Sequence, residues 1–177
     1  MMGITATAMQ LAQPRDSIVR RADARDGEAL ARLIEEPMLA LGGTRRDGDG
    51  IALLELADAG IDTFVAEGRD GLQGFLQLRW GLRPPSNSWM RGSVELRRHY
   101  VRMRHRGAGV AIRLLEHAVR AASARGAHCI WLKVDKDATH AVRFYQKHEF
   151  RIAGTALFLD GQRQREHWVM HRSLVKR

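Results

Sequence analysis

The sequence is poor in cysteine and has no long hydrophobic run. Its one cysteine, Cys129, excludes an internal disulfide and a cysteine-rich metal site, and it suits a reducing compartment, so we expect a cytoplasmic protein. Nowhere do about 18 apolar residues follow one another, and residues 1–16 lack the basic flank and apolar core of a signal peptide. We therefore expect no membrane segment, and we interpret residues 1–16 as a disordered tail or a tag remnant.

Lysine is also scarce, although the chain is strongly basic. Only four of the 29 Lys and Arg residues are lysines, and the formal net charge is +9. Such a surface attracts anions, namely nucleotide phosphates, nucleic acid or an acidic membrane, and charge alone does not choose among them. Because the arginines are scattered, most are expected on the solvated surface. The length of 177 residues fits one domain, which we place at residues 17–177.

Apolar periodicity predicts an alternation of strands and helices. The clearest helix carries Leu114, Leu115, Ala118 and Ala122 on one face, and Gly126 is available to end it. Two pairs of strands flank Gly-containing turns typical of hairpins. The expected strands are residues 17–21, 63–67, 72–78, 93–103, 128–134, 151–159 and 167–171, and the expected helices are residues 23–36, 51–57, 107–126 and 140–147. The pattern indicates a mixed α/β fold.

A glycine-rich turn precedes the clearest helix. Residues 106–111, Arg-Gly-Ala-Gly-Val-Ala, place small residues where the chain must turn tightly. Consecutive backbone N–H groups can then point into one space at the positive end of the helix, a setting that suits a pyrophosphate. Taken alone, Gly107 and Gly109 fit a simple tight connection equally well.

Two stretches together resemble the GNAT acetyltransferase superfamily. Residues 106–111 are similar to its Gln/Arg-x-x-Gly-x-Gly/Ala signature, with the apolar Val101 eight residues before Gly109. The strand at 130–134 and the helix at 141–147, followed by Phe150, are similar to the next strand and helix of that family. Residues 95–101 and the ending from 158–161 to 169–170 also resemble the small bacterial amine and polyamine acetyltransferases.

The resemblance implies a strongly twisted, mostly antiparallel central sheet of about six to seven strands, opened between two strands to admit acyl-CoA, with helices on both faces. It implies direct transfer of acetyl from acetyl-CoA to a primary amine in a ternary complex, without a metal or a covalent intermediate. The residues implied in acetyl-CoA binding end one strand and form the turn and helix start: Tyr100, Val101, Met103, Arg106, Gly107, Ala108, Gly109, Val110, Ala111 and Ile112.

Two catalytic side chains also follow from the resemblance. Tyr145 matches the family tyrosine that protonates or hydrogen-bonds the departing sulfur, and the alternative is a core tyrosine. Glu95 matches by its spacing the glutamate base of histone-type members, and the alternative is an ion pair with Arg97 or Arg98 at the sheet surface. His99 is a second candidate base, although a histidine within a strand is more often packed or solvated.

Three positions depart from the family pattern. Lys133 stands where N-terminal acetyltransferases of ribosomal proteins carry a glutamate base, which argues against that subgroup. Ala138 replaces an asparagine that normally contacts the cofactor arm. Glu149 replaces the usual glycine before Phe150, where a left-handed helix end is expected, at a cost of roughly 1 kcal/mol.

The acceptor is expected opposite acetyl-CoA, against the first helices and the loop at 41–49. The acidic residues Glu35, Glu36, Asp47 and Asp49 are available there to attract a cation, which favours a small amine or a polyamine. A protein or peptide amine is the alternative acceptor, and the fold allows a homodimer through its terminal strands.

Two functions of another class compete with the enzyme. A non-catalytic acyl-CoA sensor would bind CoA without transfer, and a regulatory module would bind nucleic acid with steep salt dependence, which we consider less favoured. The eight histidines show no metal-binding spacing, so no metal is expected.

Overall fold

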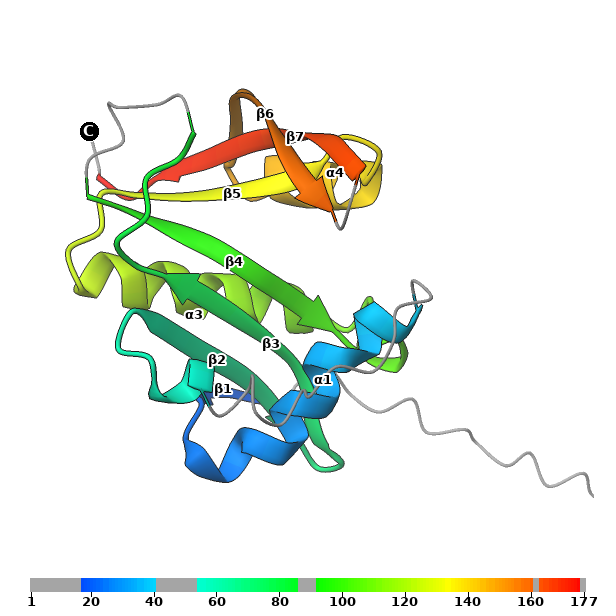
Figure 1. Ribbon diagram of the computed structural model, residues 1–177. Coiled ribbons are helices and arrows are strands. Elements are labelled where there is room, and N and C mark those ends of the chain that lie inside the picture. Colours follow the sequence, from blue (N-terminus) through cyan, green and yellow to red (C-terminus); the bar gives the residue numbers. More distant parts are fainter. Residues whose placement is uncertain (1–16, 41–53, 86–91, 161–162, 176–177) are drawn as a thin grey trace, which may run out of the picture.

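The computed structural model describes residues 17–40, 54–85, 92–160 and 163–175 (Figure 1). Its centre is a seven-stranded sheet in the order β1-β2-β3-β4-β5-β7-β6. Neighbouring strands are antiparallel, except for β4 and β5, which run parallel. The expected mostly antiparallel α/β sheet is therefore confirmed. Within the described ranges, no helix combines the length and apolar character needed to cross a membrane.

The elements follow the expected order with small shifts at their ends. The strands are β1 (Ile18–Arg21), β2 (Ile61–Gly68), β3 (Gly71–Arg79), β4 (Ser93–Val101), β5 (Cys129–Asp135), β6 (Arg151–Asp160) and β7 (Arg163–Ser173). The helices are α1 (Gly27–Ala40), α3 (Val110–Ala124) and α4 (Thr139–Lys147), with 3-10 turns η1 (Ala24–Asp26) and η2 (Met103–His105). Residues 54–57, the described part of the helix expected at 51–57, are helical.

Three expected boundaries were wrong for identifiable reasons. The helix expected from residue 107 begins only at Val110, because Gly107 and Gly109 have φ of 78° and 75°, outside the helical region. The helix expected from residue 23 begins with η1, where Asp23 and Asp26 form a capping box. Strand β7 starts earlier than expected because it pairs with β6 as far as Arg163.

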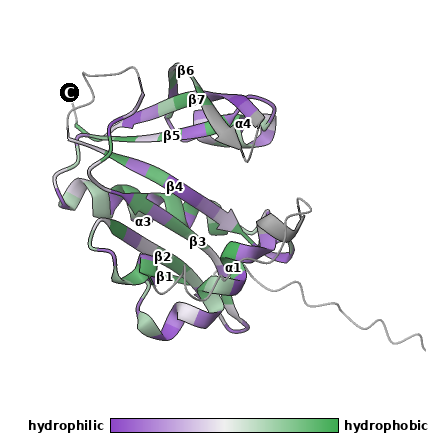
Figure 2. Ribbon diagram, in the orientation of Figure 1, coloured by the Kyte–Doolittle hydropathy of each residue, from purple (hydrophilic) through white to green (hydrophobic). Residues whose placement is uncertain are grey.

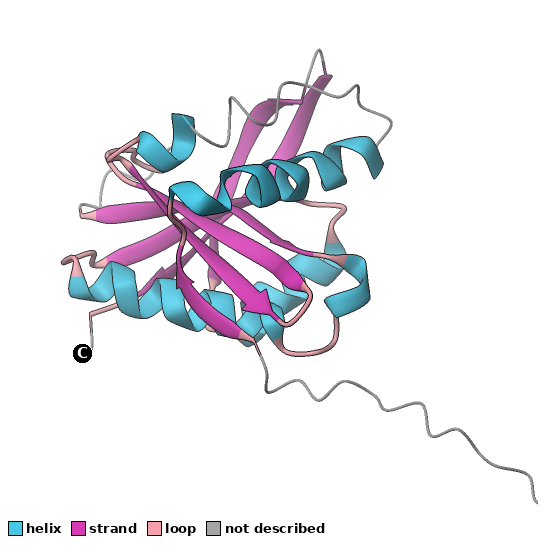
Figure 3. Ribbon diagram, turned by 90° about the horizontal axis from the view of Figure 1, so that it is seen from below, coloured by secondary structure: helices cyan, strands magenta, loops and turns pink. Residues whose placement is uncertain are grey.

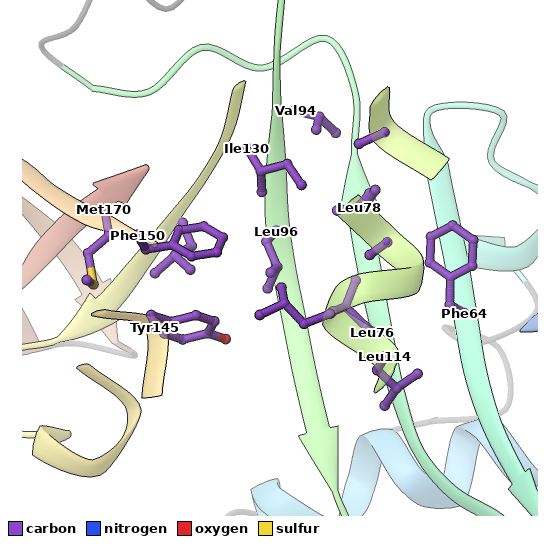
Figure 4. Close-up of a cluster of buried hydrophobic side chains, with 14 of the residues drawn as sticks. Phe64, Leu76, Leu78, Val94, Leu96, Leu114, Ile130, Tyr145, Phe150 and Met170 are labelled. Carbon is purple, nitrogen blue, oxygen red and sulfur yellow. The ribbon is translucent and has the colours of Figure 1, made fainter. Parts of the chain in front are cut away.

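Helices cover both faces of the sheet (Figure 3). Alternate residues of β2 and β3 point to opposite faces, so Val65 and Phe75 pack with Leu30 and Leu33 of α1. On the other face, Phe64, Leu76 and Leu78 join Leu114 and Leu115 of α3 in the largest buried cluster. That cluster continues through Ile130, Tyr145, Phe150 and Met170, so it joins both halves of the sheet (Figure 4).

The helix end after α4 confirms the left-handed geometry expected at Glu149. Glu149 has φ of 67° and is the one non-glycine residue with positive φ in the described part of the chain. Its carboxylate pairs with Arg172 at 2.8 Å, but the glutamate side chain is 75% exposed, so this ion pair contributes little.

We expect Glu149→Gly to be more stable than Glu149→Ala by about 1 kcal/mol. Both variants lose the ion pair with Arg172, and only glycine relieves the left-handed backbone. Urea unfolding of the two variants measures the difference. Equal stability would show that the backbone at this position is not strained.

Candidate active site

Strands β4 and β5 separate shortly after they meet. They pair only at Ser93 with Cys129, Val94 with Ile130 and Glu95 with Trp131. Beyond this point β4 continues to Val101 and β5 to Asp135 without pairing with each other, and Figure 1 shows them diverging. The facing edges therefore carry backbone N–H and C=O groups that the neighbouring strand does not take up.

Polar residues follow the separated half of β4. Figure 2 shows hydrophilic residues toward the end of this strand, after its hydrophobic start. They belong to the stretch Arg97-Arg98-His99-Tyr100. Each of these side chains has a polar partner within the protein: Glu55 for the two arginines, Tyr145 for His99 and Glu36 for Tyr100.

Tyr145 of α4 reaches β4 through its hydroxyl group. The Tyr145 ring packs against Phe150 and Phe144, with ring centroids 5.3 Å apart in each pair. Its hydroxyl oxygen points toward β4 in Figure 4 and lies 3.3 Å from Nδ1 of His99. Tyr145 is thus both a core residue and the donor of a hydroxyl group beside the separated strand.

Burial decides the protonation states of this pair. It raises the pKa of the Tyr145 phenol well above its ordinary value, so the hydroxyl keeps its proton. Burial also lowers the pKa of the His99 imidazole to about 4, so the histidine is neutral at neutral pH. A neutral His99 can accept a hydrogen bond from Tyr145, whereas it is a poor proton acceptor for an ammonium group.

Glu95 lies at the last paired position before the strands separate. Its side chain is only 4% exposed, and Oε1 lies 4.0 Å from Nζ of Lys133 on β5. The alternative expectation, an ion pair with Arg97 or Arg98, was wrong. Both guanidinium groups instead contact Glu55, at 2.7 and 2.5 Å.

The backbone of the glycine-rich turn is accessible at Gly107. A Cβ atom added at Gly107 would meet nothing within 4 Å, so a ligand can approach the backbone there. Gly109 is the N-cap of α3 and offers no side-chain cap, so the first N–H groups of that helix lack intrahelical partners. Arginines brace the turn, because Arg106 Nε donates to Val101 O and Arg113 Nη1 donates to Ala108 O, each at 3.2 Å.

The residues expected to bind acetyl-CoA fall into one continuous run beside the separated strands. Tyr100 and Val101 end β4, and Met103 is 76% exposed in η2. Val110 points into the core and is 2% exposed, so only its backbone N–H is available to an anion. Ala108, Ala111 and Ile112 are partly buried against the same core.

Two of the four acidic residues expected to attract the acceptor, Glu35 and Glu36, lie within the described residues. Glu36 of α1 accepts a hydrogen bond from the Tyr100 hydroxyl at 3.0 Å and pairs with Arg102 at 2.8 Å. Its charge is therefore compensated. Glu35 lies beside it on α1, and Asp47 and Asp49 lie outside the described residues.

The sequence did not reveal three contacts of this site. The pairs Tyr145–His99, Glu36–Arg102 and Glu55–Arg98 join residues far apart in the chain, and no local pattern announces them. The thiol of Cys129 is buried, which raises its pKa to about 11, so it is a packed side chain rather than a nucleophile. In the residues that the structure describes, no group of His, Cys, Asp or Glu could hold a metal ion.

Curated proteins with similar sequences are acetyltransferases. The chain is 32% identical to streptothricin acetyltransferase of Streptomyces lavendulae over 150 residues, which cover 80% of this chain and 74% of that protein. It is 37% identical to an uncharacterized N-acetyltransferase of Mycobacterium tuberculosis over 82 residues, or 46% of this chain. The match spans 53% of the mycobacterial relative, about half of its length.

Solved structures share the fold at lower sequence identity. An acetyltransferase of Salmonella typhimurium with its cofactor acetyl-CoA superimposes with a TM-score of 0.73 and 19% identity, over 92% of this chain and 96% of that chain. An N-acetyltransferase of Staphylococcus aureus gives a TM-score of 0.72 and 20% identity, over 90% and 99%. The sequence profile of the acetyltransferase (GNAT) family matches residues 28–150, and the chain belongs to that family.

Proposed function

We propose that this protein transfers the acetyl group of acetyl-CoA to a primary amine of a small molecule. The observation that carries the proposal is the separation of β4 from β5 directly beyond Glu95, with the Tyr145 hydroxyl facing the separated strand. The open glycine-rich turn at the start of α3 fits the pyrophosphate of CoA, and the free strand edges fit its pantetheine arm.

Acetyl-CoA supplies a thioester whose carbonyl an amine can attack directly. The chain then has two proton transfers to manage. Glu95 takes a proton from the acceptor ammonium, and the freed amine forms the new C–N bond. The tetrahedral adduct collapses, the C–S bond breaks, and Tyr145 donates its proton to the departing sulfur, while the second proton that the nitrogen loses as the amide forms restores the Tyr145 phenol. His99 accepts a hydrogen bond from Tyr145 and holds the hydroxyl before the reaction.

The small-molecule acceptor rests on the relatives and on Lys133. Streptothricin acetyltransferase is a relative whose match covers 80% of this chain. Lys133, 4.0 Å from Glu95, replaces the acid of the subgroup that acetylates ribosomal proteins, and a cation there disfavours that subgroup's mode of base catalysis. A peptide acceptor remains the competing proposal, and a non-catalytic acyl-CoA sensor is the competing class.

We expect Tyr145→Phe and Glu95→Gln each to lower kcat by about 10²- to 10⁴-fold, the usual contribution of a proton-transfer group. Both changes preserve shape in buried positions, so the melting temperature should change little. Thiol release from acetyl-CoA is measured with diamines, polyamines, aminoglycosides, amino acids and basic peptides. Unchanged kcat in both variants would remove these residues from the mechanism. Acetyl-CoA binding without turnover of any amine would favour the sensor.

We expect Gly109→Ala to weaken CoA binding by about tenfold or more, because a side chain disfavours the φ of 75° and its Cβ would lie 3.1 Å from Arg113 Nη1. Gly126→Ala is the matched control, since Gly126 has φ of 86° and follows the opposite end of α3. Titration calorimetry with CoA compares the variants. Equal affinities in both would show that the turn does not bind the pyrophosphate.

We expect His99 to make folding stability fall with acidification. Its pKa is about 4 in the folded protein and near 6.5 when exposed, so the unfolded chain binds more protons between these values. Stability is therefore lost as the pH falls from 6.5 toward 4. His99→Gln should flatten this slope in urea unfolding at several pH values. His99 contacts Tyr145, and the nearby charge of His148 lowers the pKa of His99 further. If the pH dependence of stability is unchanged in His99→Gln, it arises from His148 or from other histidines.

A further inference from the structure

Two arginines of β4 share one carboxylate beside the proposed reaction site. Glu55, in the helical segment at 54–57, is 8% exposed. It accepts hydrogen bonds from Arg97 Nη1 at 2.7 Å, Arg98 Nη1 at 2.5 Å and Gln77 Nε2 at 3.0 Å. Gln77 Oε1 in turn accepts from Arg98 at 3.0 Å. This Arg97/Arg98/Glu55 cluster therefore holds two positive charges and one negative charge.

A β-bulge puts both arginines on the same face. Gln77 of β3 pairs with Arg98, and the next residue, Leu78, pairs with Leu96, so Arg97 is an extra residue in β4. In a regular strand consecutive side chains point to opposite faces. The bulge removes this alternation and lets both guanidinium groups reach Glu55. Bulges are frequent next to active sites, where they redirect side chains.

Within the residues that the structure describes, the cluster has more positive than negative charge. Burial lowers the pKa of Arg98, and the neighbouring charge of Arg97 lowers it further, against the opposing effect of Glu55. Each guanidinium has five N–H donors, yet in the part of the chain that the structure describes only the Nη1 groups are engaged. The two side chains are 26% and 30% exposed, so their remaining donors are accessible to a ligand.

The position of the cluster relates it to the acceptor. Glu95 and Arg98 pair with Arg79 and Gln77 of β3, which are two residues apart, so their side chains share a face, and both arginines lie beyond the last pairing with β5. At about 3.3 Å per residue, these two register positions place Arg98 roughly 7 Å along the strand from Glu95. A single small molecule can span that distance with an amine at one end and an anion at the other.

From this arrangement we infer that the acceptor carries a carboxylate as well as its primary amine, as in an amino acid, and that Arg97 and Arg98 bind this carboxylate. The inference rests on the proposed function. The inference disfavours polyamines as acceptors. Glu36 is the acidic residue that would attract a second cation, and it already pairs with Arg102 and accepts a hydrogen bond from Tyr100. Guanidinium groups are well suited to this role, since their planar N–H donors match a carboxylate.

The test compares amino acids with their amides and with the corresponding decarboxylated amines, for example lysine, lysinamide and cadaverine, as acceptors in a thiol-release assay. We expect the carboxylate forms to be favoured. We also expect Arg97→Gln or Arg98→Gln to lower kcat/KM for them by about 10- to 100-fold through KM, with little change for the amides. Arg25→Gln, which removes an exposed arginine paired with Asp23, should leave kcat/KM unchanged.

Glu55→Gln is expected to change KM in the opposite direction from the arginine variants. It keeps a hydrogen-bond acceptor in the cluster but removes the competing charge, so it should lower KM for carboxylate acceptors, whereas a purely structural cluster would not become a better binding site. Arg97→Lys should recover part of the lost activity if charge is what matters. Melting temperatures of all variants establish that they fold.

Preference for diamines or amides over amino acids, or equal losses for all acceptors in the arginine variants, would overturn the inference. Failure of the proposed function looks different, because no acceptor would then be acetylated. In that case calorimetric titration of the CoA-saturated protein with the same amino acids still decides whether Arg97 and Arg98 bind a carboxylate.

Discussion

The separation of two parallel strands is the constraint on which the rest of this structure depends. Every other neighbouring pair in the sheet is antiparallel, and β4 and β5 pair at three positions only. Past Glu95 the edges of both strands are free, although their backbone groups need partners. The glycine-rich turn follows β4 after the short 3-10 turn η2, so one extended ligand can satisfy the strand edge and the helix start together. The buried cluster on one face still joins the two halves of the sheet.

Aromatic packing gives the site its rigidity. Tyr145 is held by Phe144 and Phe150, so its hydroxyl has one direction available, toward His99 of β4. The same burial that fixes the ring keeps the phenol protonated and the imidazole neutral. A proton donor is thus maintained at neutral pH without a charged partner beside it. In the mechanism that we propose, catalysis and core stability therefore depend on the same side chain.

The high net positive charge can be interpreted only from the ion pairs that individual arginines form. Much of the positive charge is compensated, as at Asp62, which pairs with Arg21 and Arg125 and accepts from Trp80. Arg97 and Arg98 are different, because they share a single carboxylate and stand at the separated strand. A net charge of +9 therefore does not require a nucleic-acid partner. In our proposal, the functional part of this charge is local and consists of Arg97 and Arg98.

The sequence by itself determined the order of strands and helices, the glycine-rich turn, the tyrosine on α4 and the left-handed position of Glu149, because each depends on neighbours in the chain or on a short signature. Only the tertiary structure decided where β4 and β5 part, that a bulge turns Arg97 and Arg98 to one face, and that they contact Glu55. These features depend on the register between strands and on distant contacts, and hydrophobic periodicity carries no information about either.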